Sequence, residues 1–368
     1  MTTARKRAIL ITLAVLLAIF LVVSAVTLVF VDINMREMFA RAERPEYSTS
    51  LNYSDYEAGY PRSEISFYSG DNLLRGYLYG EGNTDGLVVI SHGIGGGGDN
   101  YLAETLRFVN AGFEVIAFNN TGTYDSEGEG TMSLTQSYLD LDAALDFVEN
   151  DGRFKDMPIY LYGHSWGGYA VSVVLREDHD ITAAVSVSGY DNPLVMIREW
   201  TENSMGFLPA ELLTPYIGVY NFFKYGTKSN LSASKVISST DTPIMIVHGR
   251  GDMTISYGRA SIISHQGEIT NPYAIFITRD KLGQDDHNTL FMSQDAVTYM
   301  IRTNQERKEL EAQYGSPLPN EVSSEFYANI DRERINRLDD DFMQTVINFF
   351  RSHQKEEDFL KQLLGDAI

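Results

Sequence analysis

The stretch Tyr160–Val171, YLYGHSWGGYAV, sets one serine among glycines where a strand pattern changes into a helix pattern. The apolar run 159–162 is typical of a buried strand, and the run 169–175 suits a buried helix. Between them, Gly163-His164-Ser165-Trp166-Gly167 has the spacing G-x-S-x-G. Glycines at these positions permit a turn so tight that the serine is strained and exposed. Composition alone yields such a motif in roughly one chain in ten of this length, so the partners of Ser165 decide its meaning.

Composition excludes several classes of function. The 368 residues carry a formal net charge of −21, and no basic stripe offsets it, so the chain should repel nucleic-acid phosphates. The chain has no cysteine, which excludes disulfides, thiolate zinc sites and cysteine nucleophiles. No HExxH or similar ligand spacing occurs, so we expect no metal.

The N-terminus has the pattern of a membrane segment. Arg5-Lys6-Arg7 precedes an uncharged, mostly apolar run over residues 8–31, which is long enough to span a bilayer core of about 30 Å. The basic cluster should stay cytoplasmic, which places the rest of the chain outside as a single-pass anchored protein. The alternative is a signal peptide cleaved near Val23-Ser24-Ala25, giving a secreted protein, but its apolar region would usually be only about 7–15 residues long.

Strand and helix patterns alternate along the rest of the chain. This alternation predicts an α/β fold, a mostly parallel sheet with helices on both faces. The expected domains are a membrane anchor (or signal peptide) at 1–31, a stalk at 32–60, a core at 61–191 and 240–368, and an inserted helical cap at 192–239. The expected strands lie at 64–69, 73–79, 86–91, 113–118, 159–162, 183–187, 243–247 and 273–278, and the last helix at 335–353.

A reactive serine needs a general base, and His287 is the best candidate among seven histidines. It lies just after the strand 273–278, so it should reach the carboxyl edge of the sheet, as Ser165 does. His164 adjoins the serine in sequence, and its side chain should point elsewhere. His92 follows the third strand and is better explained as part of an oxyanion loop there. The others are better explained by structural or surface positions: His179, His248, His265 and His353.

The acid that orients the base is expected at Asp252. This residue follows the strand 243–247, at the edge where ligands gather in open α/β sheets. Asp241 precedes the same strand and therefore sits at the wrong end. Asp285 and Asp286 are rivals, but they adjoin His287 in sequence, which makes contact with its Nδ1 awkward.

The glycine loop, residues 91–98 (SHGIGGGG), has two interpretations. Its G-x-G-x-x-G spacing after a strand matches a dinucleotide-binding fingerprint. That fold places an acid at the end of the next strand, which here ends in Phe118-Asn119-Asn120-Thr121, without one. We therefore expect no cofactor, and an oxyanion hole made by the backbone N–H groups of Ile94 and Trp166.

The motifs HGIGGGG, GHSWGG, HGRGD and the DDH loop occur in this order over about residues 60–290. Together with the last helix, they resemble the α/β-hydrolase superfamily, in particular its serine hydrolases: esterases, monoacylglycerol-lipase-like enzymes and serine aminopeptidase-like enzymes. The resemblance implies eight mostly parallel strands with the second antiparallel, a cap after the sixth, and the triad Ser165, Asp252 and His287. Two features depart from it: 119–122 (NNTG), where many relatives carry Asp and Arg, and the long charged stretch 294–334.

The expected activity is hydrolysis of a small-molecule carboxylic ester, by acyl transfer to water. A peptidase of the serine aminopeptidase-like type is the first alternative, with Glu199, Glu202 or Glu211 of the cap holding a free amino terminus. A non-catalytic, surface-anchored binding protein is the second. The substrate and the oligomeric state stay open at this level.

Overall fold

The computed structural model describes residues 3–354, and its centre is an eight-stranded sheet. The strand order is β1-β2-β4-β3-β5-β6-β7-β8; β2 runs antiparallel to β1 and β4, and all other neighbours are parallel. The predicted fold class is therefore confirmed. The strands are β1 (Arg62–Ser69), β2 (Asn72–Tyr79), β3 (Leu87–Ser91), β4 (Glu114–Phe118), β5 (Ile159–His164), β6 (Ile181–Val187), β7 (Ile244–Gly249) and β8 (Ala274–Arg279).

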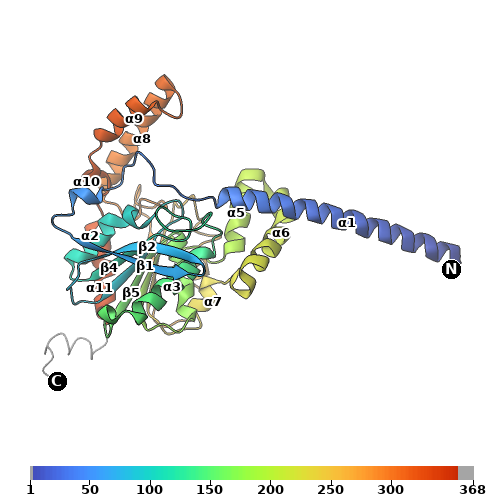
Figure 1. The fold of residues 1–368 in the computed structure, drawn as a ribbon, viewed down its shortest axis with the longest axis horizontal. Helices are drawn as coiled ribbons and strands as arrows, with labels where there is room; N and C mark the ends of the chain where they lie inside the picture. Colours follow the sequence, from blue (N-terminus) through green and yellow to red (C-terminus); the bar gives the residue numbers. More distant parts are fainter. Residues whose placement is uncertain (1–2, 355–368) are drawn as a thin grey trace.

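Helices cover both faces of the sheet (Figure 1). On one face α2 (Leu102–Asn110) and α11 (Asp340–Ser352) enclose an apolar cluster, and on the other face α3 (Gln136–Asn150) and α4 (Trp166–Val173) enclose a second. Every residue of the central strands β3, β5, β6 and β7 is buried. Burial on both faces explains why these strands read as continuous apolar runs.

Two helices leave the core between β6 and β7, and we call them the cap: α5 (Pro193–Met205) and α6 (Phe207–Tyr225). The expected cap region also contains α7 (Ala233–Ile237), but this short helix packs into the core cluster beside α4. Asn192 starts α5, because its side chain accepts hydrogen bonds from the backbone N–H groups of Leu194 and Val195.

The charged stretch after β8 forms an arm, α8 (Gln294–Tyr314) and α9 (Asn320–Ala328), that projects from the domain (Figure 1). A short helix, α10 (Arg332–Ile335), returns the chain to the core. The last helix begins at Asp340 rather than at the expected residue 335. Asp339 is the reason, since its side chain accepts from the N–H groups of Asp341 and Phe342 and caps the helix there.

The N-terminal helix α1 (Thr3–Met38) is long and apolar enough to cross a membrane, and most of it projects from the domain (Figure 1). Its last turns differ, because Val31, Met35 and the following Phe39 are buried in the core. The expected stalk, residues 32–60, is divided: residues 32–38 belong to α1, and residues 39–60, the N-terminal segment, contact the domain. Arg41 donates to backbone carbonyls of the loop 124–128, and Arg44 pairs with Asp99.

Candidate active site

The turn between β5 and α4 holds Ser165 in a strained backbone conformation. Its φ of 57° and ψ of −112° lie in a region that non-glycine residues rarely adopt. A Cβ at Gly163 would lie 2.2 Å from the carbonyl oxygen of Gly167, and a Cβ at Gly167 would lie 1.8 Å from that of Ser91. No side chain fits at these distances, so the tight turn that presents Ser165 requires both glycines.

His287 reaches Ser165 from the loop after β8. Its Nε2 lies 2.9 Å from Ser165 Oγ, and its Nδ1 lies 2.7 Å from Asp252 Oδ2. Because the Asp252 carboxylate can only accept, Nδ1 carries the proton and Nε2 is free to accept from the serine hydroxyl. The structure thus brings together the three side chains expected from the sequence, and all three are buried.

The Asp252 carboxylate is held on both oxygens. Its Oδ1 accepts from the N–H groups of Thr254 and Ile255, at 2.9 and 2.8 Å. A second histidine, His248, places Nε2 at 3.2 Å from Oδ2. Burial acts to raise the pKa of Asp252, but the hydrogen bonds from His248 and His287 outweigh it and hold that pKa below its usual range. Asp252 therefore stays ionised while it orients His287.

The rival carboxylates shape the loop instead of reaching the imidazole. Asp286 Oδ1 accepts from the backbone N–H of His287 at 2.8 Å. Asp285 Oδ1 accepts from the N–H of Gly283 at 3.1 Å. Both contacts lie within the loop. Neither carboxylate makes the contact with His287 Nδ1 that its position next to this histidine in the sequence made awkward.

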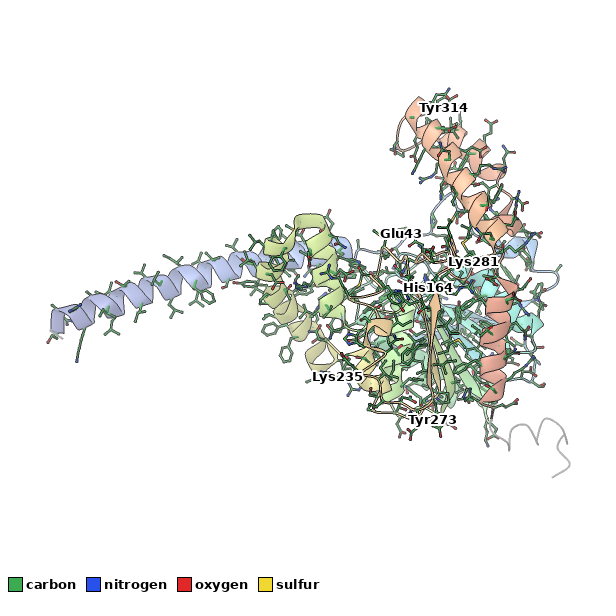
Figure 2. The ribbon with its side chains drawn as sticks, turned by 180° about the vertical axis from the view of Figure 1, so that it is seen from behind. Glu43, His164, Lys235, Tyr273, Lys281 and Tyr314 are labelled. Atoms are coloured by element: carbon green, nitrogen blue, oxygen red, sulfur yellow. The ribbon has the colours of Figure 1, made fainter. Side chains whose placement is uncertain are left out.

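A cleft of about 510 Å³ opens at Ser165 and His287. It lies at the carboxyl edge of the sheet: Figure 2 shows His164, the last residue of β5, at the edge opposite Tyr273, which precedes β8. Its walls come from the glycine loop, the start of α2, the cap, the residues after His287 and the N-terminal segment. Trp200 is the cap's contribution, and its Nε1 donates to Thr254 O at 3.2 Å beside Asp252.

Comparisons with known proteins relate this chain to hydrolases. A family profile described as "Serine aminopeptidase, S33" matches residues 82–214. Over 150 residues the chain is 30% identical to the monoglyceride lipase of Mus musculus, covering 39% of this chain and 46% of that protein. Over 184 residues it is 27% identical to the lysophosphatidylserine lipase ABHD12 of Xenopus tropicalis, covering 46% of this chain and 44% of that protein. The chain therefore spans under half the length of these relatives.

A solved structure with the same fold is an esterase from Pyrococcus furiosus. It superposes with a TM-score of 0.51 at 17% sequence identity, over 75% of this chain and 97% of that one. This chain has the α/β-hydrolase fold. At this low identity the superposition establishes the fold alone, because one fold hosts many unrelated functions.

Sequence reasoning missed a role for His164 in this hydrolase fold. Its Nε2–H donates to the backbone carbonyl of His287 at 2.9 Å, and its Nδ1 accepts from the Tyr101 hydroxyl at 2.7 Å. Tyr101 in turn accepts from the N–H of Gly93 at 2.9 Å. Burial, and then the nearby His287, lower the pKa of His164 to about 3, so it is neutral and fits this donor and acceptor pattern. His164 thereby connects the loop after β8 that carries His287, which we call the base loop, to the glycine loop.

The departure at residues 119–122 also has a structural role. Asn119 Oδ1 accepts from the N–H of Gly98 at 2.9 Å, and the N–H of Asn120 donates to His92 Nε2 at 3.0 Å. His92 Nδ1–H donates to Gly93 O at 2.8 Å. Burial lowers the pKa of His92 to about 4, which keeps it neutral. The asparagines and His92 therefore fix the shape of the glycine loop, which sequence spacing alone did not reveal.

The three cap glutamates weighed for an amino-terminus site are already engaged. Glu199 accepts from the backbone and hydroxyl of Ser256, while Glu202 pairs with Arg259 at 2.6 Å. Glu211 pairs with Arg198. None of the three lines the cleft.

A different carboxyl, Glu104 on α2, lines the cleft. It is buried, and burial raises its pKa to about 7, against the contribution of its own backbone N–H. Within residues 3–354 its side chain makes no hydrogen bond to another residue. Glu104 was not singled out in the sequence, because a glutamate in an amphipathic helix normally faces solvent.

One cluster of side chains has a spacing that a metal ion could use. Asp146, Glu149 and His179 bring one ligand atom each to within 4.8 Å of one another. The imidazole of His179 already bridges Glu149 and Asp142, at 3.1 and 3.0 Å. The cluster shares no residue with the cleft, so we assign it no part in the chemistry at Ser165.

Proposed function

We propose that this protein is a serine hydrolase that cleaves a carboxylic ester. Ser165 Oγ attacks the ester carbonyl carbon while His287 Nε2 takes the hydroxyl proton. The tetrahedral intermediate then expels the alcohol, which receives that proton from His287. A water molecule attacks the resulting acyl-enzyme by the same route, and the acid and free Ser165 are released. The supporting observation is the buried chain Ser165–His287–Asp252, with contacts of 2.9 and 2.7 Å at the mouth of a cleft.

The proposed oxyanion hole consists of the N–H groups of Ile94 and Trp166. Trp166 is the first residue of α4, and first-turn N–H groups have no acceptor within their own helix. Ile94 belongs to the glycine loop that lines the cleft. Losing one oxyanion donor typically costs about 10²–10³ in rate, so the fixed shape of this loop matters for catalysis.

Labelling with a fluorophosphonate probe tests the nucleophile. The probe should modify Ser165 in the folded protein, and peptide mapping should recover the adduct there. Ser165→Ala should lose both labelling and hydrolysis of p-nitrophenyl butyrate while its melting temperature stays unchanged. The matched control Ser188→Ala alters another serine with a positive φ, which follows β6, and should keep both signals. Undiminished turnover by Ser165→Ala would overturn the assignment of Ser165 as the nucleophile. No labelling of a folded sample would favour the non-catalytic binding protein.

An amidase acting on a free amino terminus is the second candidate. Glu104 favours it, because this carboxyl faces the cleft and could pair with a substrate ammonium group. Turnover of aminoacyl p-nitroanilides should then exceed that of acyl p-nitrophenyl esters, and Glu104→Gln should raise KM for the anilides only. Faster ester turnover, with no effect of Glu104→Gln on KM, supports the esterase.

We further infer that α1 is an uncleaved membrane anchor with the catalytic domain on the extracytoplasmic side. Its apolar run is exposed in the protein, which suits lipid contact. Ser24 hydrogen-bonds to Tyr216 of the cap, a contact that cleavage after Ala25 would remove. In sealed cells, protease added outside should digest the catalytic domain. The purified mature protein should still begin upstream of Ala25, and an N-terminus beginning at Val26 would support a secreted form.

A further inference from the structure

The outer face of α6 is apolar and uncovered. Six large apolar side chains of this helix stand exposed in the protein, and the largest exposed fractions are 70% for Leu212, 71% for Leu208 and 83% for Phe223. Phe207, Val219 and Phe222 complete the set. Contiguous exposed apolar surface of this kind marks a contact with another apolar phase.

Few charges lie on this helix. The helix carries only Glu211 and Lys224 among its 19 residues. Glu211 is paired with Arg198 of α5, and Lys224 Nζ lies 5.1 Å from the centre of the Tyr220 ring. Aromatic side chains are enriched where protein segments meet a membrane interface, and α6 carries six of them among its 19 residues.

The position of α6 beside α1 identifies the apolar phase. The hydroxyls of Tyr216 and Ser24 lie 3.0 Å apart, and Figure 1 shows the cap next to the part of α1 that enters the domain. Ser24 precedes Asp32, the first charged residue after the apolar run, by eight residues. At 1.5 Å per residue this is about 12 Å along the helix. If Asp32 remains among the lipid headgroups, Tyr216 lies deeper, on the hydrocarbon side of the headgroups.

We propose that the outer face of α6 is a lipid-binding surface, seated in the outer layer of the same bilayer that α1 spans. The inference rests on the proposed anchoring of α1 and goes beyond it, because a simple tether would leave the cap in water. In this arrangement the side chains of Leu208, Leu212 and Phe223 contact lipid acyl chains. The cap carries Trp200 of the cleft, so this contact also fixes the active site at the membrane surface.

Spin labelling of the full chain tests the proposal directly. The sequence has no cysteine, so a single introduced cysteine is the only labelling site. Leu212→Cys and Phe223→Cys report on the cap, and Val15→Cys reports on α1. Leu282→Cys, at a residue 87% exposed in the loop after β8, is the control matched to Phe223. Each variant is labelled with a nitroxide, checked for p-nitrophenyl butyrate hydrolysis and reconstituted in phosphatidylcholine vesicles.

Collision rates with oxygen, which concentrates in lipid, and with a water-soluble nickel chelate place each label. The labels at 212 and 223 should show the same pattern of collision rates as the label at 15. Oxygen collisions should dominate, and the nickel collision rate should be at least five-fold below that at 282. Nickel collisions at 212 and 223 equal to those at 282, with the label at 15 in lipid, would overturn the lipid contact of the cap. A label at 15 exposed to nickel would instead overturn the anchoring on which the proposal rests.

Discussion

At the residue scale, the hydroxyl of Tyr101 joins the glycine loop to the base loop. It accepts from the N–H of Gly93 and donates to His164, which holds the backbone carbonyl of His287. Tyr101→Phe should lower kcat for p-nitrophenyl butyrate by roughly ten-fold, or about 1.4 kcal/mol, because both loops lose a fixed partner. KM should change little.

The melting temperature of Tyr101→Phe should also fall, since a buried N–H and a buried ring nitrogen lose their partner at about 1–3 kcal/mol. Tyr47→Phe is the control, because it removes only a long surface hydrogen bond of 3.4 Å to Asn320 O. Equal kcat values for the two variants would show that the Tyr101 link does not position the site.

Glu104 gives the free energy of unfolding a pH dependence with a defined sign. Burial raises its folded-state pKa to about 7 from an ordinary value of 4.5. The folded protein therefore binds this proton more tightly than the unfolded chain. The stability that this proton contributes is complete below about pH 4.5 and is lost as the pH rises through about 7.

Glu104→Gln should remove that pH-dependent loss. At pH 8 the variant should be more stable than the natural protein by about 3 kcal/mol, since each pKa unit corresponds to about 1.4 kcal/mol. Near pH 4.5 the gain should largely vanish. Thermal melting of both proteins in detergent at pH 5 and pH 8 measures this, and a melting-temperature difference independent of pH would contradict it.

The site was predictable as far as position along the strands determines it. Ser165, Asp252 and His287 each follow a parallel strand, and all carboxyl ends of parallel strands meet at one sheet edge. The contacts of His248, His164 and Glu104 depend on side-chain direction and on loops that meet only after folding, so spacing could not reveal them.

At the element scale, Gly167 sets how closely α4 approaches β3. A Cβ there would lie 1.8 Å from the backbone oxygen of Ser91, which cannot move without shifting a central strand. Gly167→Ala should therefore abolish activity and give little folded protein. Gly258→Ala, where a Cβ meets nothing within 4 Å, is the matched control and should behave as the natural protein. A soluble and active Gly167→Ala would show that β3 and α4 can separate.

The same contrast between local and distant causes explains which elements the sequence predicted. Central strands lie within a few residues of their expected positions, because a strand buried on both faces appears in the sequence as a continuous apolar run. Residues 39–60 read as a stalk, because their anchors are far along the chain: Arg41 holds the carbonyls of the loop 124–128. The start of α11 depended on one cap, Asp339, which hydrophobic periodicity cannot locate.

At the scale of the whole molecule, α1 is both a projecting helix and part of the core. Its exposed residues run along most of its length, yet Val31 and Met35 are only 2% and 3% exposed and join the cluster under α3 and α4. The arrangement ties the orientation of the catalytic domain to that of α1. With α1 anchored in a bilayer as proposed, a domain fixed in this way would keep its cap at one height relative to that bilayer, which a flexible stalk would not do.

The double variant Val31→Ala and Met35→Ala should measure this coupling. Fully burying a Val or Met side chain contributes about 1.5–3 kcal/mol, and truncation to Ala loses most of that. The full chain in detergent should therefore melt several degrees lower. Ile33→Ala and Met38→Ala form the matched control, because these residues of the same helix are exposed and touch no core. Equal melting temperatures for the two double variants would mean that α1 is only a tether, since the folding of the catalytic domain would then not depend on it.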